Sequence, residues 1–325
     1  MKLGVIGAGK IIPFHLNAAL QVGFELEGII ARDNSVNAER VAKDFKFNKC
    51  YRTFSEFVDS ANSFDAILIA SHASSLFTVL KSLSKFNIPI LIEKPIFVDK
   101  SQLGDWESIP NQNKILVGYN RRYYKTIQRL KKVIQQNPSA RVHFKIPELS
   151  GQEPIDNDMI RKIVVENTVH MLDLIQFCIG SKSLDVRNLR SLVKTSDTAL
   201  FDVSEDGLKT CEIMFGYAEN YSIEVLVDGI RIVVKPLEVI ATYTSMEILT
   251  PNEIIPFKRY IPKPSPQKAD TFHESADQKP GFLGQYVELS NMTTGGRDKI
   301  GARFSDSINV SKFALEFLDL FLFKA

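Results

Sequence analysis

The stretch GVIGAGKIIPFH, residues 4–15, places Gly7 and Gly9 between an apolar run typical of a strand and the start of a helical pattern. At such a turn the first glycine permits tight bending, the second lets the backbone approach a pyrophosphate, and the helix start supplies amide donors. Ile12 stands where the dinucleotide-binding fingerprint has its third glycine, which should alter helix–strand packing without removing the phosphate contact. An ordinary strand–helix turn is the alternative interpretation. We expect this turn to bind a dinucleotide cofactor through Gly7, Gly9, Lys10 and Ile11.

Strands and helices alternate from this turn to about residue 120, and the later chain is richer in strands. Alternation of this kind predicts an α/β domain with a doubly wound, mostly parallel sheet. We therefore expect a Rossmann domain at residues 1–122 and a second domain at 123–325. In the second domain, Asp228-Gly229 between apolar runs predicts a β-hairpin. The polar, proline-containing stretch 262–280 predicts a loop.

The bulk composition is that of an ordinary globular protein. The chain has 325 residues, of which 44% are hydrophobic and 24% charged, and its net charge is +2. We therefore expect no nucleic-acid or membrane partner, and we find no apolar run long enough for a signal segment or a membrane span. Three widely spaced cysteines, Cys50, Cys178 and Cys211, favour a reducing compartment and hence a cytoplasmic location. None has a neighbour at metal-ligand spacing, so no metal is expected.

The end of the second predicted strand reads GIIARD, residues 28–33. Rossmann enzymes that use NAD carry an acidic residue there, which bonds the ribose 2′-hydroxyl. Ala31 at that position, followed by the guanidinium of Arg32, favours a 2′-phosphate and therefore NADP(H). A shift of one or two residues would instead make Asp33 the acid, so NAD(H) is the alternative.

Three further motifs follow in order along the chain. Glu93-Lys94-Pro95 ends a short apolar run, GYNRRY occupies residues 118–123, and Glu166, His170 and Asp173 lie in a helical pattern. Spacings of four and three place these last side chains near one helix face. Together with the glycine-rich turn, the motifs resemble the glucose–fructose oxidoreductase, inositol dehydrogenase and MocA (Gfo/Idh/MocA) family. The resemblance covers nearly the whole chain.

The resemblance implies a fold and an activity. The fold would be a Rossmann domain followed by an α+β domain with an open, mostly antiparallel sheet, used for substrate binding and oligomerisation. Members of the family are mostly NAD(P)-dependent oxidoreductases of sugars or cyclitols. We therefore expect hydride transfer between nicotinamide and a secondary alcohol or ketone of a sugar or nucleotide sugar. The resemblance also implies a homodimer or homotetramer.

The resemblance assigns roles to individual residues. Lys94 is implied to be the catalytic proton-transfer group, since a partly desolvated lysine has a lowered pKa. His170 is implied to be a catalytic or substrate-orienting imidazole, and Glu166 to tune it or to bond substrate hydroxyls. The implied substrate contacts are Lys94, Arg122, Glu166, His170 and Asp173. The implied cofactor contacts beyond the glycine-rich turn are Arg32, Ser71, His72, Glu93, Lys94 and Asn120.

Departures from the family pattern leave the substrate open. Glu166 replaces an aspartate, and Thr168 replaces the usual glycine. In the loop over the cofactor, His72 and Leu76 stand at the family's proline and histidine positions. Two alternative functions share the Rossmann site: a glycosidase that retains NAD for a transient oxidation, and a nucleotide-binding regulator without catalysis.

Overall fold

The computed structural model describes residues 1–32, 35–97, 99–148, 156–180, 184, 186–191, 198–264, 279–296 and 300–323. These residues form two compact units, each with its own sheet. The first unit comprises the described parts of 1–123, 165–174 and 274–315. The second comprises the described parts of 124–164, 175–273 and 316–325.

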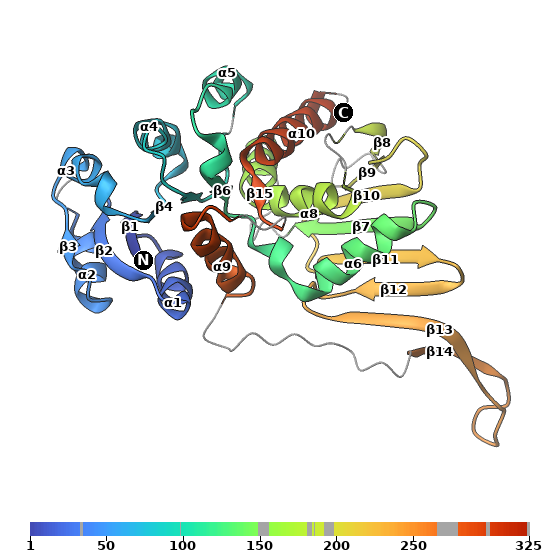
Figure 1. The fold of residues 1–325 in the computed structure, drawn as a ribbon. Coiled ribbons are helices and arrows are strands. Elements are labelled where there is room, and N and C mark those ends of the chain that lie inside the picture. Colours follow the sequence, from blue (N-terminus) through green and yellow to red (C-terminus); the bar gives the residue numbers. More distant parts are fainter. Residues whose placement is uncertain are drawn as a thin grey trace. The chain divides into compact units, whose positions relative to one another are not determined.

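The sheet of the first unit has the strand order of a Rossmann fold (Figure 1). Its strands are, in spatial order, β15 (Ala302–Arg303), β6 (Ile115–Val117), β5 (Ile90–Ile92), β4 (Ala66–Ile69), β1 (Lys2–Ile6), β2 (Glu25–Ile30) and β3 (Lys49–Cys50). All neighbours are parallel except β15 with β6. Because β1 pairs with both β2 and β4, the strand order reverses there. The carboxyl ends of β1 and β4 therefore form the switch point at which open α/β sheets bind ligands.

Helices cover both faces of this sheet. Figure 1 shows α1 (Ile12–Val22) and α9 (Phe282–Thr293) on one side, and α4 (Ala73–Leu83) and α5 (Leu103–Glu107) on the other. Leu16 of α1 and Leu289 of α9 share one hydrophobic core with Leu3 and Val5 of β1. All four residues of β4 are buried. Burial on both faces explains why the strands are nearly continuous apolar runs. The region that alternates strands and helices also contains α2 (Val36–Asp44) and α3 (Phe54–Asp59).

The second unit contains an open sheet with one parallel pair. Its strands are, in spatial order, β14 (Arg259–Pro264), β13 (Ile240–Leu249), β12 (Ile230–Val234), β11 (Ser222–Val227), β7 (Arg141–Glu148), β10 (Lys209–Phe215), β9 (Thr198–Asp202) and β8 (Arg187–Ser191). Only β7 and β10 pair in parallel among these described strands. Asp228 and Gly229, with φ angles of 48° and 75°, join β11 to β12. Two successive positive φ angles are those of a type I′ hairpin turn, so the predicted hairpin is confirmed.

Helices pack on one face of this second sheet. α6 (Lys125–Gln136) buries Ile127, Leu130 and Ile134. α7 (Asn157–Ile163) continues through a π-helical turn, Val164–Thr168, into α8 (Val169–Ile179). The end of α10 (Phe304–Phe323) lies over the sheet, since the ring of Phe317 is 5.5 Å from that of Phe201 in β9. None of the described helices has the length and apolar character needed to cross a membrane.

The structure confirms the expected fold class and differs from the expectation in detail. Residues 165–174 and the described part of 274–315 belong to the first unit, so 123–325 does not form one compact unit. Its assignment as a substrate and oligomerisation domain stays a prediction. Three strands were not expected from the sequence, namely β7, β8 and β15. The last of these, β15, has only two residues and is defined by its pairing with β6. Of the loop expected at 262–280, β14 takes the first residues, and 265–278 lie outside the described residues.

Candidate functional site

The turn between β1 and α1 leaves open space beside the helix start. Gly7 has a φ of +123°, and its amide donates to the carbonyl oxygen of Ile30 at 2.7 Å. A Cβ at Gly7 would lie 2.2 Å from the carbonyl oxygen of Ala70, whereas a Cβ at Gly9 would meet nothing within 4 Å. No side chain caps the described start of α1, where the amide of Ile12 donates to the carbonyl oxygen of Gly9 at 3.1 Å. The turn therefore fits the pyrophosphate of a dinucleotide against Gly9.

A pocket of about 290 Å³ adjoins this turn and extends along the carboxyl ends of β4, β5 and β6. Ile11 from the turn and Ala70 from the end of β4 contribute to its wall. The polar and charged residues of its wall are Ser71, Glu93, Lys94, Asn120, His170 and Lys279. All of these except Lys279 were expected from the sequence. The structure thus places them together at the edge of the sheet where a Rossmann fold binds its ligands.

Lys94 follows β5, and a backbone carbonyl holds its ammonium group. Its Nζ donates to the carbonyl oxygen of Glu166 at 2.6 Å. That carbonyl belongs to the π-helical turn before α8, a departure from α-helical geometry that is frequent at functional sites. Burial lowers the pKa of Lys94, and the charges of Lys279 and Arg121 add to this, against the carboxylate of Glu93. An amine with a lowered pKa takes and returns a proton at a lower pH than an exposed lysine does.

His170, near the start of α8, presents a neutral imidazole to the same pocket. Its ring stands edge-on to that of Tyr119, with centroids 5.9 Å apart and an interplanar angle of 86°. Nδ1 is buried and has no hydrogen-bond partner among the described residues. Burial lowers the pKa of His170 well below its ordinary value, and the charges of Arg121, Lys94 and Lys279 lower it further. The ring is therefore uncharged at neutral pH and suited to accept a hydrogen bond or a proton.

Three residues that the sequence did not mark contribute to this site. Nε2 of His15 lies 3.0 Å from Oε1 of Glu93, and its Nδ1 lies 3.2 Å from the hydroxyl of Tyr286. Lys279 precedes α9 and places a second ammonium group on the pocket wall. From its place after the start of the first helix, His15 is expected to be a packing residue or a residue near the helix dipole. The contacts join residues 78 and 271 positions apart, so no local pattern could reveal them.

Arg122 and Asp173 form a buried ion pair away from the pocket wall. Nε of Arg122 donates to both carboxylate oxygens of Asp173, and its Nη2 donates to Oδ1 at 2.6 Å. Nη1 reaches Asp306 at 3.3 Å. Burial raises the pKa of Asp173 to about 6, against the charge and hydrogen bonds of Arg122. The pair anchors the helix that carries His170, and the expected direct contact of either residue with substrate stays a prediction.

Other expected site residues lie at the margin of this arrangement. His72 caps α4, since its Nδ1 accepts the amide of Ser74 at 3.4 Å, and it does not line the pocket. Glu166 is exposed, and the atom of this residue that accepts from Lys94 is its backbone carbonyl oxygen, not its carboxylate. Arg32 is exposed just beyond β2, and Asp33 lies outside the described residues. The roles expected for His72, Glu166 and Arg32 stay predictions.

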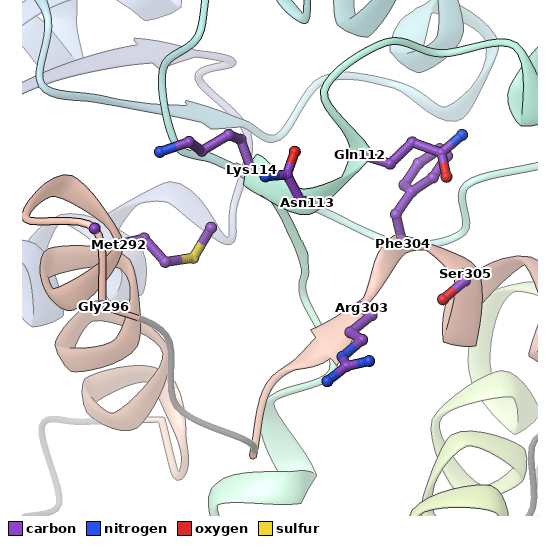
Figure 2. Close-up of a pocket in the computed structure, with 9 residues that line it drawn as sticks. Gln112, Asn113, Lys114, Met292, Gly296, Arg303, Phe304 and Ser305 are labelled. Carbon is purple, nitrogen blue, oxygen red and sulfur yellow. The ribbon is translucent and has the colours of Figure 1, made fainter.

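A larger pocket of about 460 Å³ lies elsewhere in the first unit, between the end of α9 and the start of α10. Its wall includes the side chains of Lys114, Met292, Arg303 and Phe304. Figure 2 shows Lys114 and Arg303 extending away from each other, so the two cations do not converge on one point. None of the expected site residues lines this pocket. The described residues also contain no group of three or more His, Cys, Asp or Glu side chains that could hold a metal ion.

Comparison with known proteins agrees with this geometry. Residues 1–114 match the GFO_IDH_MocA family model, described as the oxidoreductase family with an NAD-binding Rossmann fold. UDP-N-acetylglucosamine 3-dehydrogenase of Acidithiobacillus ferrooxidans is 25% identical over 189 residues, covering 58% of this chain and 57% of that protein. Inositol 2-dehydrogenase of Corynebacterium glutamicum is 24% identical over 234 residues, covering 70% of this chain and 66% of that protein. These matches therefore span less than two thirds of either relative.

Solved structures share the fold over almost the full length. The UDP-N-acetylglucosamine 3-dehydrogenase from A. ferrooxidans has a TM-score of 0.69 at 16% identity, covering 97% of this chain and 96% of that chain. A levoglucosan dehydrogenase in complex with NADH and levoglucosan has a TM-score of 0.71 at 13% identity, covering 100% and 98%. The motifs, the match over residues 1–114 and the shared fold make this chain similar to the Gfo/Idh/MocA oxidoreductases, and the matched residues form a Rossmann fold of the kind that binds a nicotinamide cofactor.

Proposed function

We propose that this protein is an NAD(P)-dependent oxidoreductase that transfers a hydride between nicotinamide and a secondary alcohol or ketone of a sugar. The observation that carries the proposal is the position of Lys94. It lies at the carboxyl end of β5, beside His170 in the 290 Å³ pocket that adjoins the glycine-rich turn. The names of the relatives, which act on a nucleotide sugar and on inositol, support a sugar, nucleotide sugar or cyclitol as substrate.

Lys94 is the group that moves the proton. A bound nicotinamide supplies the acceptor or donor of the hydride. As hydride leaves the carbinol carbon, the hydroxyl proton passes to Nζ of Lys94, and in the reverse direction Nζ returns it to the carbonyl oxygen. The lowered pKa raises the fraction of neutral amine available to accept that proton. The 2.6 Å hydrogen bond to the carbonyl of Glu166 fixes Nζ in one place, which favours a single productive geometry.

His170 assists without carrying a positive charge. Its low pKa leaves it neutral, so it suits a role as acceptor for a substrate hydroxyl or as a second base. The Glu166 carboxylate is assigned to a further substrate hydroxyl. Arg122 and Asp173 act as positioning residues, because their ion pair fixes the helix that presents His170.

Lys94→Ala tests the catalytic assignment. Removal of a general acid–base group should lower turnover by about 10²–10⁴-fold while the Kd for cofactor changes little. Purified protein is titrated with NADPH and NADH by fluorescence and then assayed with UDP-N-acetylglucosamine, myo-inositol and levoglucosan. Lys114→Ala is the matched control, since it removes a lysine that lines the 460 Å³ pocket and does not line the 290 Å³ pocket. Equal turnover in Lys94→Ala and wild type would contradict the assignment, and wild-type protein that binds neither cofactor would refute the function.

NADP(H) is the proposed cofactor, with NAD(H) as the alternative. Arg32 supports the choice because it is exposed beyond the carboxyl end of β2, where a 2′-phosphate would lie in a Rossmann fold. Arg32→Ala should weaken NADPH binding by about tenfold or more, the loss expected for one charge-assisted phosphate contact, and leave NADH binding unchanged. Arg40→Ala, in the exposed part of α2, is the control. An unchanged preference between the two cofactors in Arg32→Ala would contradict the assignment.

The proposed assembly is a homodimer or homotetramer located in the cytoplasm. Exposed apolar side chains on the β13–β14 hairpin support association, namely Met246, Ile248, Ile254, Phe257, Tyr260 and Ile261. Exposed apolar patches of this kind commonly mark interaction surfaces. No disulfide joins the three cysteines, consistent with a reducing compartment. Light scattering coupled to gel filtration measures the assembly, and a monomer at micromolar concentration would contradict this part of the proposal.

A further inference from the structure

A buried chain of three polar side chains lies behind the wall of the 290 Å³ pocket. It consists of Glu93, His15 and Tyr286, and we call it the Glu93 triad. His15, on α1, is fully buried, and Nε2 is 3.0 Å from Oε1 of Glu93 while Nδ1 is 3.2 Å from the hydroxyl of Tyr286. The imidazole also packs on the ring of Phe282, with centroids 4.6 Å apart. Contacts on its edge and its face therefore fix the ring.

The hydrogen-bond directions in the triad leave a carboxylate at its end. A neutral imidazole has one N–H donor and one acceptor nitrogen. In the tautomer that carries its proton on Nε2, His15 donates to Glu93 and accepts from the Tyr286 hydroxyl at Nδ1. Burial raises the pKa of Tyr286 well above its ordinary value, and so does the charge of Glu93, which keeps the phenol protonated as a donor. Burial alone would raise the pKa of Glu93, but the hydrogen bond and electrostatic interaction with His15 and the charges of Lys94 and Lys279 lower it.

The carboxylate of Glu93 forms part of the pocket wall. Its side chain keeps 15% of its surface accessible, whereas His15 keeps none. A Cβ at Gly118 would lie 2.8 Å from Oε1 of Glu93, so the glycine at the end of β6 gives this carboxylate its space. Glu93 is also the only acidic residue among the described residues that line the pocket. The triad thus delivers one fixed negative charge to a wall that otherwise carries ammonium groups.

We infer that His15 and Tyr286 are positioning residues that hold Glu93 ionised at the nicotinamide pocket, so that its carboxylate favours the oxidised cofactor over the reduced one. The physical reason is charge. The oxidised nicotinamide ring is a cation and the dihydronicotinamide ring is neutral, so a fixed carboxylate in a partly buried site attracts only the first. The inference rests on the proposed function and adds how this chain sets the balance between the two cofactor forms.

The test measures Kd for the oxidised and reduced cofactor by calorimetry, in wild type and in variants of the triad. Glu93→Gln keeps the size of the side chain and removes its charge, so the Kd for the oxidised form should rise about tenfold more than that for the reduced form. His15→Phe should shift the same ratio in the same direction, and Tyr286→Phe should shift it less. His15→Gln, whose amide can still donate to Glu93, should restore part of the wild-type ratio.

A purely structural role would weaken binding of both cofactor forms equally. Tyr123→Phe is the matched control, because it removes another buried tyrosine hydroxyl, one that donates to Glu288 at 2.6 Å. Near-ultraviolet circular dichroism checks that each variant folds. If His15→Phe does not fold, the ratio of the two Kd values in Glu93→Gln tests the inference on its own. A ratio unchanged in Glu93→Gln would overturn the inference and leave the proposed function standing. Wild-type protein that binds neither form would refute the function itself.

Discussion

The two glycines of the first turn should respond oppositely when each is replaced by alanine. At Gly7, a Cβ would lie 2.2 Å from the carbonyl oxygen of Ala70, while ordinary contact begins near 3.4 Å. The φ of +123° adds a backbone cost of about 1–3 kcal/mol, and the overpacking adds about 1–3 kcal/mol. Gly7→Ala should therefore lower the free energy of unfolding by roughly 2–6 kcal/mol.

Gly9→Ala is the internal control, because its Cβ would meet nothing within 4 Å. Its free energy of unfolding should stay within about 0.5 kcal/mol of wild type. Its methyl group would instead occupy the space into which a pyrophosphate must come, so cofactor affinity should fall by at least about tenfold.

Urea unfolding followed by tryptophan fluorescence measures the stability of the unit that holds both glycines. Trp106 is the only tryptophan of the chain and is buried in that unit, so the signal reports on it directly. Fluorescence titration with NADPH and NADH measures affinity. Wild-type stability in Gly7→Ala, or wild-type affinity in Gly9→Ala, would show that the reasoning about this turn is wrong.

Two more outcomes are expected from buried charges. Asp173→Ala removes a carboxylate that accepts three hydrogen bonds from the buried Arg122 guanidinium, so the free energy of unfolding should fall by about 3–5 kcal/mol in the same urea assay. Glu107→Gln, which breaks an exposed pair in the same unit, should cost less than about 1 kcal/mol, and equal losses in the two variants would contradict the argument. The rate of alcohol oxidation should rise with pH as Lys94 loses its proton, with a midpoint below the ordinary lysine pKa of 10.5, because burial lowers that pKa. A pH–rate profile that is flat, or that falls as pH rises through neutrality, would exclude Lys94 as the base.

The family resemblance implied that Lys94, Ser71 and Asn120 lie at the cofactor site, and the sequence pattern agrees with it. Each comes directly after a short apolar run that forms a parallel strand, and the carboxyl ends of parallel strands meet at one edge of a sheet. The alternation of strand and helix was sufficient to predict that edge. The hairpin at Asp228-Gly229 was likewise predictable, because its positive φ angles depend on two adjacent residues.

The strand β7 shows where the local pattern was insufficient. Its residues alternate between buried and more exposed positions only up to Ile146, and Pro147 and Glu148 are buried as well. It pairs in parallel with β10 and antiparallel with β11, so its place in the sheet depends on distant partners. Pairing of this kind is non-local and leaves little trace in the segment itself.

By itself the sequence determined the Rossmann domain, the glycine-rich turn, the nicotinamide cofactor and the position of Lys94 at the end of its strand. The domain, the turn and the strand end depend on periodicity and on spacing within one or two neighbouring elements, whereas the nicotinamide cofactor was implied by the resemblance to the family. Only the tertiary structure decided that Lys94 bonds a carbonyl rather than the Glu166 carboxylate, that Arg122 pairs with Asp173, and that His15 and Tyr286 support Glu93. The reason is that the partner of a buried side chain depends on which other elements pack against it. Here the hydrogen-bonded residues are up to 271 positions apart in the sequence. Spacing over such a separation says nothing about which residues meet in space.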